Sequence, residues 1–128
     1  MNIKESAQNY LETILILHKK NGSVRSIDVA NYMNYTKASI SVAMKHLRES
    51  DYIAIAADGK ITLTPSGREI AEMLYERHQV IADILIALGV NEKTAYEDSC
   101  KIEHDLSEES FEKIKECLYK HHTQFRKS

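Results

Sequence analysis

Glycine, proline and cysteine are all scarce in this chain. Its 128 residues include four glycines, one proline and two cysteines. Because proline breaks helices and glycine weakens them, this scarcity favours a mainly α-helical protein. The two cysteines lie seventeen residues apart in a chain that does not open with a secretory leader, which does not predict a disulfide framework. We therefore expect free thiols in a reducing compartment.

The chain also lacks a long hydrophobic run. The longest candidate, residues 80–90, is interrupted by Asp83 and falls short of the roughly 20 residues that a membrane-spanning helix needs. We therefore predict a soluble, cytoplasmic protein with no membrane partner. The chain is long enough to bury a hydrophobic core.

The charge is unevenly distributed, although the net charge is only −2. Residues 19–48 contain six lysines or arginines and a single acidic residue, Asp28, whereas residues 64–128 contain 9 basic and 13 acidic side chains. A surplus of positive charge in one segment suits a polyanionic partner. This predicts that the N-terminal part, and not the C-terminal part, binds nucleic acid.

Residues 26–49 predict two short helices joined by a tight turn, with Ser26 capping the first and Thr36 the second. The second helix has an apolar stripe of Ile40, Ala43, Met44 and Leu47. Its opposite face is small, apolar and basic, which suits the DNA major groove, where lysine meets phosphates or base edges and small apolar groups meet thymine methyls. Such a pair of helices is typical of a helix-turn-helix.

Residues 51–63 change to a period of two. Ile53 and Ile55 alternate with small residues, Asp58-Gly59 predicts a two-residue turn, and Ile61 and Leu63 continue the alternation. A β-hairpin directly after a helix-turn-helix predicts a winged helix. Such folds also serve as protein-interaction modules, but the local charge of +5 over residues 19–48 favours double-stranded operator DNA. The predicted DNA-binding residues are Ser26, Thr36, Lys37, Ala38, Ser39, Val42, Lys45, His46 and Arg48.

A long helix is predicted from Pro65, capped by Thr64, to Leu88. Its apolar stripe comprises Ile70, Leu74, Ile81, Leu85 and Leu88, and His78 lies within it. A histidine on an apolar face is, taken alone, more often a hydrogen-bonded core residue than a ligand. The stripe is longer than one small domain needs, which predicts that part of it forms a dimer interface.

The segment around residue 100 places three metal-binding side chains on one helical face. Cys100, Glu103 and His104 have the i, i+3, i+4 spacing, while Ala95, Ile102 and Leu106 gather on the opposite face. Thiolate, carboxylate and imidazole are ligands of first-row transition metals. Three donors leave a divalent ion incompletely coordinated, so further ligands must come from elsewhere. We interpret Cys117, in a last helix capped by Ser107, as a small core residue and not a ligand.

Three stretches carry a resemblance to a known family: Thr62-Leu-Thr-Pro-Ser-Gly-Arg68, Glu76-Arg-His78 and Cys100-Lys-Ile-Glu-His-Asp-Leu-Ser107. With the winged helix before them, the chain from about residue 6 to residue 118 resembles the diphtheria toxin repressor and manganese transport regulator family. The resemblance implies a homodimeric, metal-dependent repressor that holds its metal between the first helix and the dimerisation region. The implied ligands are Asn9, Glu12, His78, Cys100, Glu103 and His104.

The sequence departs from the family pattern at three points. Asn9 stands where the family has Met or Asp, Tyr96 stands where iron-sensing members have a second histidine, and the SH3-like domain is missing, as in short manganese-type members. A thiolate at Cys100 favours iron(II), cobalt(II) or zinc(II) over manganese(II), whereas the length points to manganese. The expected cofactor is iron(II) or manganese(II), and we expect that zinc(II) or cobalt(II) can replace it in vitro.

The sequence thus predicts a mainly α protein: a winged helix-turn-helix DNA-binding domain at 1–64, and a helical metal-binding and dimerisation domain at 65–128. One alternative is a metal-independent winged-helix regulator in which Cys100 senses redox state or a pocket takes a small-molecule effector. An enzyme is a third class, because a cysteine and a histidine four residues apart can form a nucleophile and base. No third orienting residue is evident, so we predict that the protein is not an enzyme.

Overall fold

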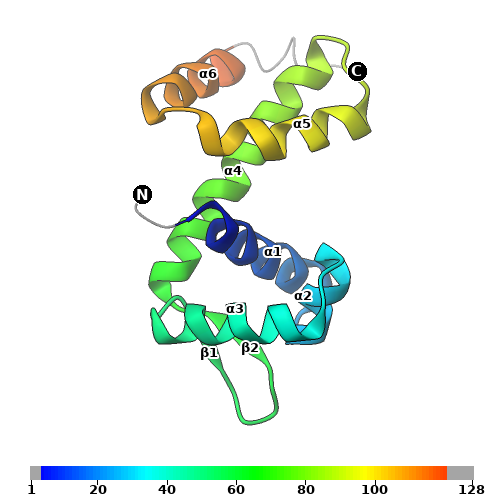
Figure 1. The fold of residues 1–128 in the computed structure, drawn as a ribbon. Coiled ribbons are helices and arrows are strands. Elements are labelled where there is room, and N and C mark those ends of the chain that lie inside the picture. The colour runs from blue at the N-terminus through cyan, green and yellow to red at the C-terminus, as the bar shows by residue number, and fades with distance from the viewer. Residues whose placement is uncertain (1–3, 121–128) are drawn as a thin grey trace. The chain divides into compact units, whose positions relative to one another are not determined.

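The structure is a computed structural model, and it describes residues 4–120. Six helices and one two-stranded sheet follow one another in this part of the chain (Figure 1). In order they are α1 (Glu5–Asn21), α2 (Ser26–Met33), α3 (Lys37–Glu49), β1 (Ile53–Ile55), β2 (Ile61–Leu63), α4 (Pro65–Ala87), α5 (Glu92–Asp105) and α6 (Glu108–Lys120). The predicted class, mainly α with a hairpin wing after a helix-turn-helix, is confirmed.

The chain folds as two units, and the division between them falls after Met73, inside α4. The first unit therefore contains α1 to β2 and the start of α4, and the second contains the rest of α4 with α5 and α6. None of the helices in residues 4–120 combines the length and the apolar composition that a membrane span requires.

The helices of the first unit begin and end at residues whose chemistry explains the boundary. Gly22 ends α1 with a φ of 82°, a left-handed conformation that glycine adopts without strain. The Thr36 side chain accepts a hydrogen bond from the Ser39 amide and caps α3, as predicted. The prediction for Ser26 was wrong, because Ser26 is the first residue of α2. The N-terminal end of α2 is stabilised instead by Asp28, whose carboxylate accepts a hydrogen bond from the backbone amide of Arg25.

The hairpin pairs Ile53 with Leu63 and Ile55 with Ile61 in an antiparallel register. The predicted two-residue turn was wrong, because five residues, 56–60, connect the strands. The Ala56 amide donates to the Lys60 carbonyl oxygen, and Gly59 has a φ of 90°. Asp58-Gly59 therefore does shape the turn, but within a longer loop.

The core of the first unit is made of aliphatic side chains from every element. On α3, Ile40, Met44 and Leu47 are buried as predicted, and Ala43 is half-buried. The other buried aliphatic residues of this unit are Leu11, Ile14, Leu15, Leu17, Val24, Val29, Ala30, Ile53, Ile61 and Ala71.

The junction between the hairpin and α4 is tightly packed. Thr64 caps α4 by accepting from the Gly67 amide, and it donates its hydroxyl to the Asp51 carbonyl oxygen. Gly67 is buried, and a Cβ atom added there would overlap the Tyr52 carbonyl oxygen. The Thr-Pro-Ser-Gly run thus starts the helix and lets its first turn approach the hairpin backbone.

In the second unit, Asn91 caps α5 and Ser107 caps α6 through hydrogen bonds to the helix amides. Its apolar core comprises Val80, Phe111 and Leu118, with Ile84, Leu106 and Ile114 packed against them. Two predictions about buried residues were wrong. Cys117 is exposed, because the buried stripe of α6 passes through Leu118 instead. Leu88, predicted to lie on the apolar stripe, follows the end of α4 and is 72% exposed.

Candidate functional site

His78 lies on α4 and faces α5 within the second unit. Its side chain is largely buried, and its ring meets the ring of Tyr96 edge-on, with 5.7 Å between the centroids. The Cys100 sulfur lies 3.5 Å from Nε2 of His78. His78 therefore lies beside a side chain that can itself bind a metal.

The helix α5 gathers the other donors on one side, as its spacing predicted. Oε2 of Glu103 lies 4.0 Å from Nδ1 of His78, and Oε1 of Glu103 lies 3.5 Å from Nε2 of His104. The Glu103 carboxylate is thus between two imidazoles. Glu103 is only 1% exposed, and burying a carboxylate is costly unless positive charge compensates for it.

Two of these separations can be compared with those around a single transition-metal ion. A tetrahedral ion with bonds of about 2.0–2.3 Å holds neighbouring ligand atoms about 3.3–3.8 Å apart. The separations of 3.5 Å between Cys100 and His78 and 4.0 Å between His78 and Glu103 are close to that range. One thiol, one carboxylate and two imidazoles also form a mixed donor set of the kind that iron, cobalt and zinc accept. The donors present therefore fit a divalent cation.

Four of the six predicted ligands form a series of neighbouring side chains in the second unit: Cys100 lies beside His78, His78 beside Glu103, and Glu103 beside His104. Asn9 and Glu12 lie on α1, in the first unit, and the role of all six residues as ligands stays a prediction. Glu12 is buried and Asn9 is half-buried. Asn9 also lines a small cavity of about 150 Å³ with Glu5, Ser6, Tyr10, Met33 and Tyr35.

The predicted DNA-binding residues form an exposed surface on and before α3. Ser26 is half-buried at the start of α2, and the others, from Thr36 to Arg48, are all exposed. Val42 is 57% exposed, so its side chain is accessible to a partner such as the thymine methyl groups of DNA.

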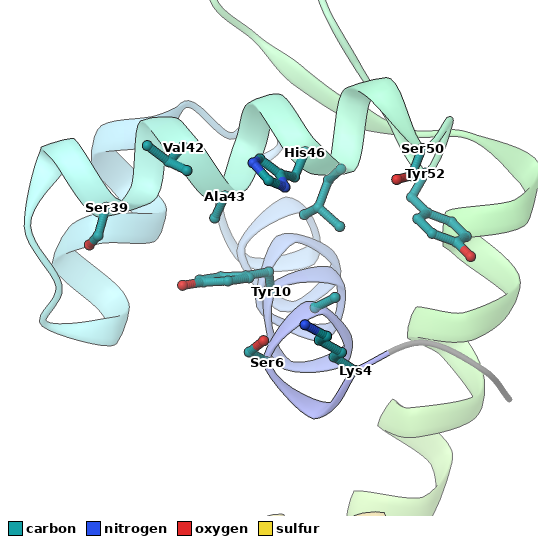
Figure 2. A pocket seen from close by; sticks show the side chains of 11 residues that line it. Lys4, Ser6, Tyr10, Ser39, Val42, Ala43, His46, Ser50 and Tyr52 are labelled. Carbon is teal, nitrogen blue, oxygen red and sulfur yellow. The ribbon is translucent and has the colours of Figure 1, made fainter.

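A groove of about 580 Å³ lies beside α3 in the first unit (Figure 2). Ser6, Tyr10 and Lys4 from the N-terminal end of α1 line one side, and Ser39, Val42, Ala43 and His46 of α3 line the other. Leu47, Ser50, Tyr52 and Ala7 complete the lining, which includes no acidic residue from the described part of the chain. Burial and the neighbouring Tyr35 raise the pKa of the Tyr10 phenol, so this hydroxyl stays a hydrogen-bond donor at neutral pH.

Sequence reasoning missed the groove residues Lys4, Ser6, Tyr10 and Tyr52. Lys4, Ser6 and Tyr10 come from the start of the described chain, and Tyr52 follows the end of α3. No periodic pattern in the sequence connects these segments with α3. The available signal was the uninterrupted lack of acidic side chains on one face of α3.

Two sequence profiles match nearly the whole chain. Residues 2–60 match the profile described as "Iron dependent repressor, N-terminal DNA binding domain", and residues 64–125 match "Iron dependent repressor, metal binding and dimerisation domain". The winged helix and the four gathered donors thus fall in two separately described parts.

Individual relatives agree. The chain is 33% identical over 115 residues to an HTH-type transcriptional regulator of Methanocaldococcus jannaschii, covering 88% of this chain and 92% of that protein. It is 31% identical over 109 residues to the HTH-type transcriptional regulator MntR of Geobacillus thermodenitrificans, covering 85% and 77%. Among solved structures, IdeR of T. acidophilum is similar with a TM-score of 0.77 and 26% identity, covering 92% of this chain and 55% of that one.

Proposed function

We propose, from the premise that this chain belongs to the family of iron-dependent repressors, that it represses transcription from operator DNA as a homodimer when it holds iron(II). The family consists of metal-dependent transcriptional regulators and not of enzymes. Its metal-dependent character argues against the alternative of a regulator that works without a metal. What supports the proposal most is the cluster of His78, Cys100, Glu103 and His104.

The proposed ligand set is the cluster in the second unit together with Glu12, and with Asn9 as a weaker or water-mediated partner. A bound divalent cation would supply the positive charge that compensates for the buried Glu103 carboxylate. Glu12 precedes the DNA-reading helices in the chain, and the four donors of the cluster follow them. Ligands from both sides of the reading head would therefore restrict the arrangement of the winged helix relative to the dimerisation region.

That restriction explains why metal supply would control DNA binding. In a dimer, two α3 helices must enter successive major grooves about 34 Å apart. A protein that already holds this arrangement loses less conformational freedom when it binds DNA. Shifting a population from 1:99 to 99:1 requires a preference of about 5.5 kcal/mol, so the metal-bound form must favour the competent arrangement by a comparable free energy.

The choice of iron(II) rests on Cys100. A thiolate is a soft donor, which suits iron(II), cobalt(II) and zinc(II), whereas manganese(II) prefers oxygen and imidazole. Manganese(II) is the competing physiological metal, because the relative from Geobacillus thermodenitrificans is named MntR and a structurally similar protein is titled a manganese-dependent transcriptional repressor in complex with manganese. Anaerobic calorimetric titration with each metal, with DNA present, decides between them.

The proposal is tested by removing single donors. Glu103→Gln and His104→Ala are expected to abolish metal-stimulated binding to operator DNA in a gel shift while the circular dichroism spectrum stays helical. Glu97→Gln, an exposed carboxylate on the same helix, is the matched control and should behave like the wild type. Unchanged metal dependence in both donor variants would refute the assignment.

A further inference from the structure

Three consecutive residues of α4, Glu76, Arg77 and His78, each contact a different part of the second unit. Successive residues of a helix point about 100° apart, so such a triplet reaches in three directions. His78 faces Cys100 and Glu103 on α5. Glu76 forms an ion pair of 3.1 Å with Lys115 on α6. Arg77 lies between Glu76 and His78 in the sequence, and its side chain is not a metal ligand.

Arg77 is buried, and its guanidinium binds the end of α5 through the main chain. Its Nη1 donates to the carbonyl oxygen of Glu103 at 3.0 Å and to that of Leu106 at 2.8 Å. The guanidinium carbon also lies 5.0 Å from the ring centroid of Phe111 on α6. Only 9% of the residue is exposed, so these contacts are made away from bulk water and are strong for their kind.

These contacts satisfy groups that a helix cannot satisfy by itself. The last four carbonyl groups of an α-helix have no partner inside the helix, and the negative end of its dipole favours a cation there. Here α5 ends at Asp105, so Glu103 and its neighbours form that last turn. The same turn carries two of the proposed donors, Glu103 and His104.

We infer that Arg77 is a positioning residue of the metal site. It fixes the last turn of α5, and with it the Glu103 carboxylate, which lies 4.0 Å from Nδ1 of His78. This inference rests on the proposed function, because it presumes that the cluster binds metal. Groups that orient ligands from outside the coordination sphere affect metal affinity by about 10–100-fold.

The residue next to Arg77 provides a matched control. Glu76 joins α4 to α6 through Lys115, and its hydrogen bond raises the pKa of Lys115. It touches neither α5 nor a donor in any contact described above. Glu76→Gln therefore tests what the loss of one interhelical contact of α4 does when the end of α5 is left alone.

The experiment measures the dissociation constant for cobalt(II) in Arg77→Gln, Arg77→Lys and Glu76→Gln, together with thermal unfolding and hydrogen exchange of the metal-free proteins. Arg77→Gln is expected to weaken cobalt(II) binding by about 10–100-fold and to speed amide exchange in the last turn of α5. Arg77→Lys keeps the charge but not the fork of donors, so it should fall between Arg77→Gln and the wild type. Glu76→Gln should stay within about threefold of the wild type in metal binding, a difference below 1 kcal/mol.

Several outcomes would overturn the inference. If Arg77→Gln and Glu76→Gln lower the unfolding temperature alike and leave cobalt(II) affinity alike, Arg77 is structural only. If Arg77→Gln does not fold, Arg77→Lys decides, and wild-type affinity in that variant refutes the positioning role. If the wild type itself binds no cobalt(II), iron(II) or manganese(II), the proposed function fails instead, and the exchange data on the metal-free proteins still report what Arg77 does for α5.

Discussion

Cys100 is the residue whose chemistry most distinguishes this candidate site. It is exposed, yet its sulfur lies 3.5 Å from a ring nitrogen of His78. Thiolates bind iron(II), cobalt(II) and zinc(II) more strongly than manganese(II). If Cys100 is a ligand, as we propose, this one side chain bears directly on which metal the protein prefers.

Replacing Cys100 by glutamate should move the preference toward manganese(II). We expect Cys100→Glu to bind cobalt(II) at least about tenfold more weakly relative to manganese(II), a change of about 1.4 kcal/mol, and to lose the thiolate-to-cobalt charge-transfer band. Competitive titration and absorption spectroscopy measure both effects. Cys117→Ser is the control, because Cys117 is also an exposed thiol. A charge-transfer band that persists in Cys100→Glu would exclude Cys100 as a ligand.

At this scale, the sequence predicted what local periodicity determines. The i, i+3, i+4 spacing of Cys100, Glu103 and His104 was sufficient to place them together, since helix geometry alone dictates it. His78 required the family resemblance, because its partner lies 22 residues away. Arg77 was missed for the same reason, and its partners are 26 and 29 residues away. Cys117 was wrongly assigned to the core because the helical period of apolar residues did not distinguish it from its neighbour Leu118, which is the buried one.

Among the elements, the start of α4 is the most constrained by packing. Gly67 lies on the first turn, where a Cβ atom would overlap the Tyr52 carbonyl oxygen. The clash involves main-chain atoms of Tyr52, the residue before β1, which cannot move as a side chain can. The Thr-Pro-Ser-Gly run could be read as a helix start from the sequence, but the need for glycine could not, because it arises from contact with another segment.

Gly67→Ala should therefore destabilise the protein, although alanine is normally the better helix former. Overpacking of this kind costs about 1–3 kcal/mol. Urea unfolding followed by circular dichroism measures the free energy of unfolding. Ser66→Ala, an exposed substitution one position earlier, should change it by less than about 0.5 kcal/mol. A stabilised Gly67→Ala variant would show that the hairpin and α4 separate easily.

The exposed face of α3 carries the prediction for DNA. Lys45 is exposed on this helix, and a lysine that neutralises a phosphate releases a counterion. Lys45→Ala should weaken binding to all duplexes and lower the slope of log affinity against log salt by about one. Fluorescence anisotropy at several salt concentrations measures the slope. Lys101→Ala, an exposed lysine on α5, should leave it unchanged, and an unaltered slope in Lys45→Ala would argue against a phosphate contact.

For the whole molecule, the proposed mechanism predicts that metal binding and transcriptional switching are separable. Four of the proposed donors belong to the second unit, so that unit holds most of what an ion needs. Glu12 belongs to the first unit. In the proposed mechanism, Glu12 contributes less to holding the ion than to linking the ion to the DNA-reading part.

Glu12→Gln should therefore bind metal without responding to it. We expect its affinity for cobalt(II) to fall by no more than about tenfold, or about 1.4 kcal/mol, while metal no longer increases its affinity for operator DNA. Calorimetry and gel shifts on the same sample measure the two properties. His104→Ala is the comparison, because it should lose both. Normal stimulation of Glu12→Gln by metal would remove Glu12 from the mechanism.

The helix α4 belongs to both units, because the division between them falls after Met73 and the helix runs from Pro65 to Ala87. A fragment cut at Thr64 would leave out Ala71, which is fully buried. A chimera that exchanges the DNA-binding unit with that of a related protein should therefore be joined within α4, after Met73. The junction should neither add nor remove residues, so that the rest of the helix keeps its faces in register. A chimera joined at Thr64, between β2 and α4, would lack the start of α4 in one unit and carry those extra residues in the other.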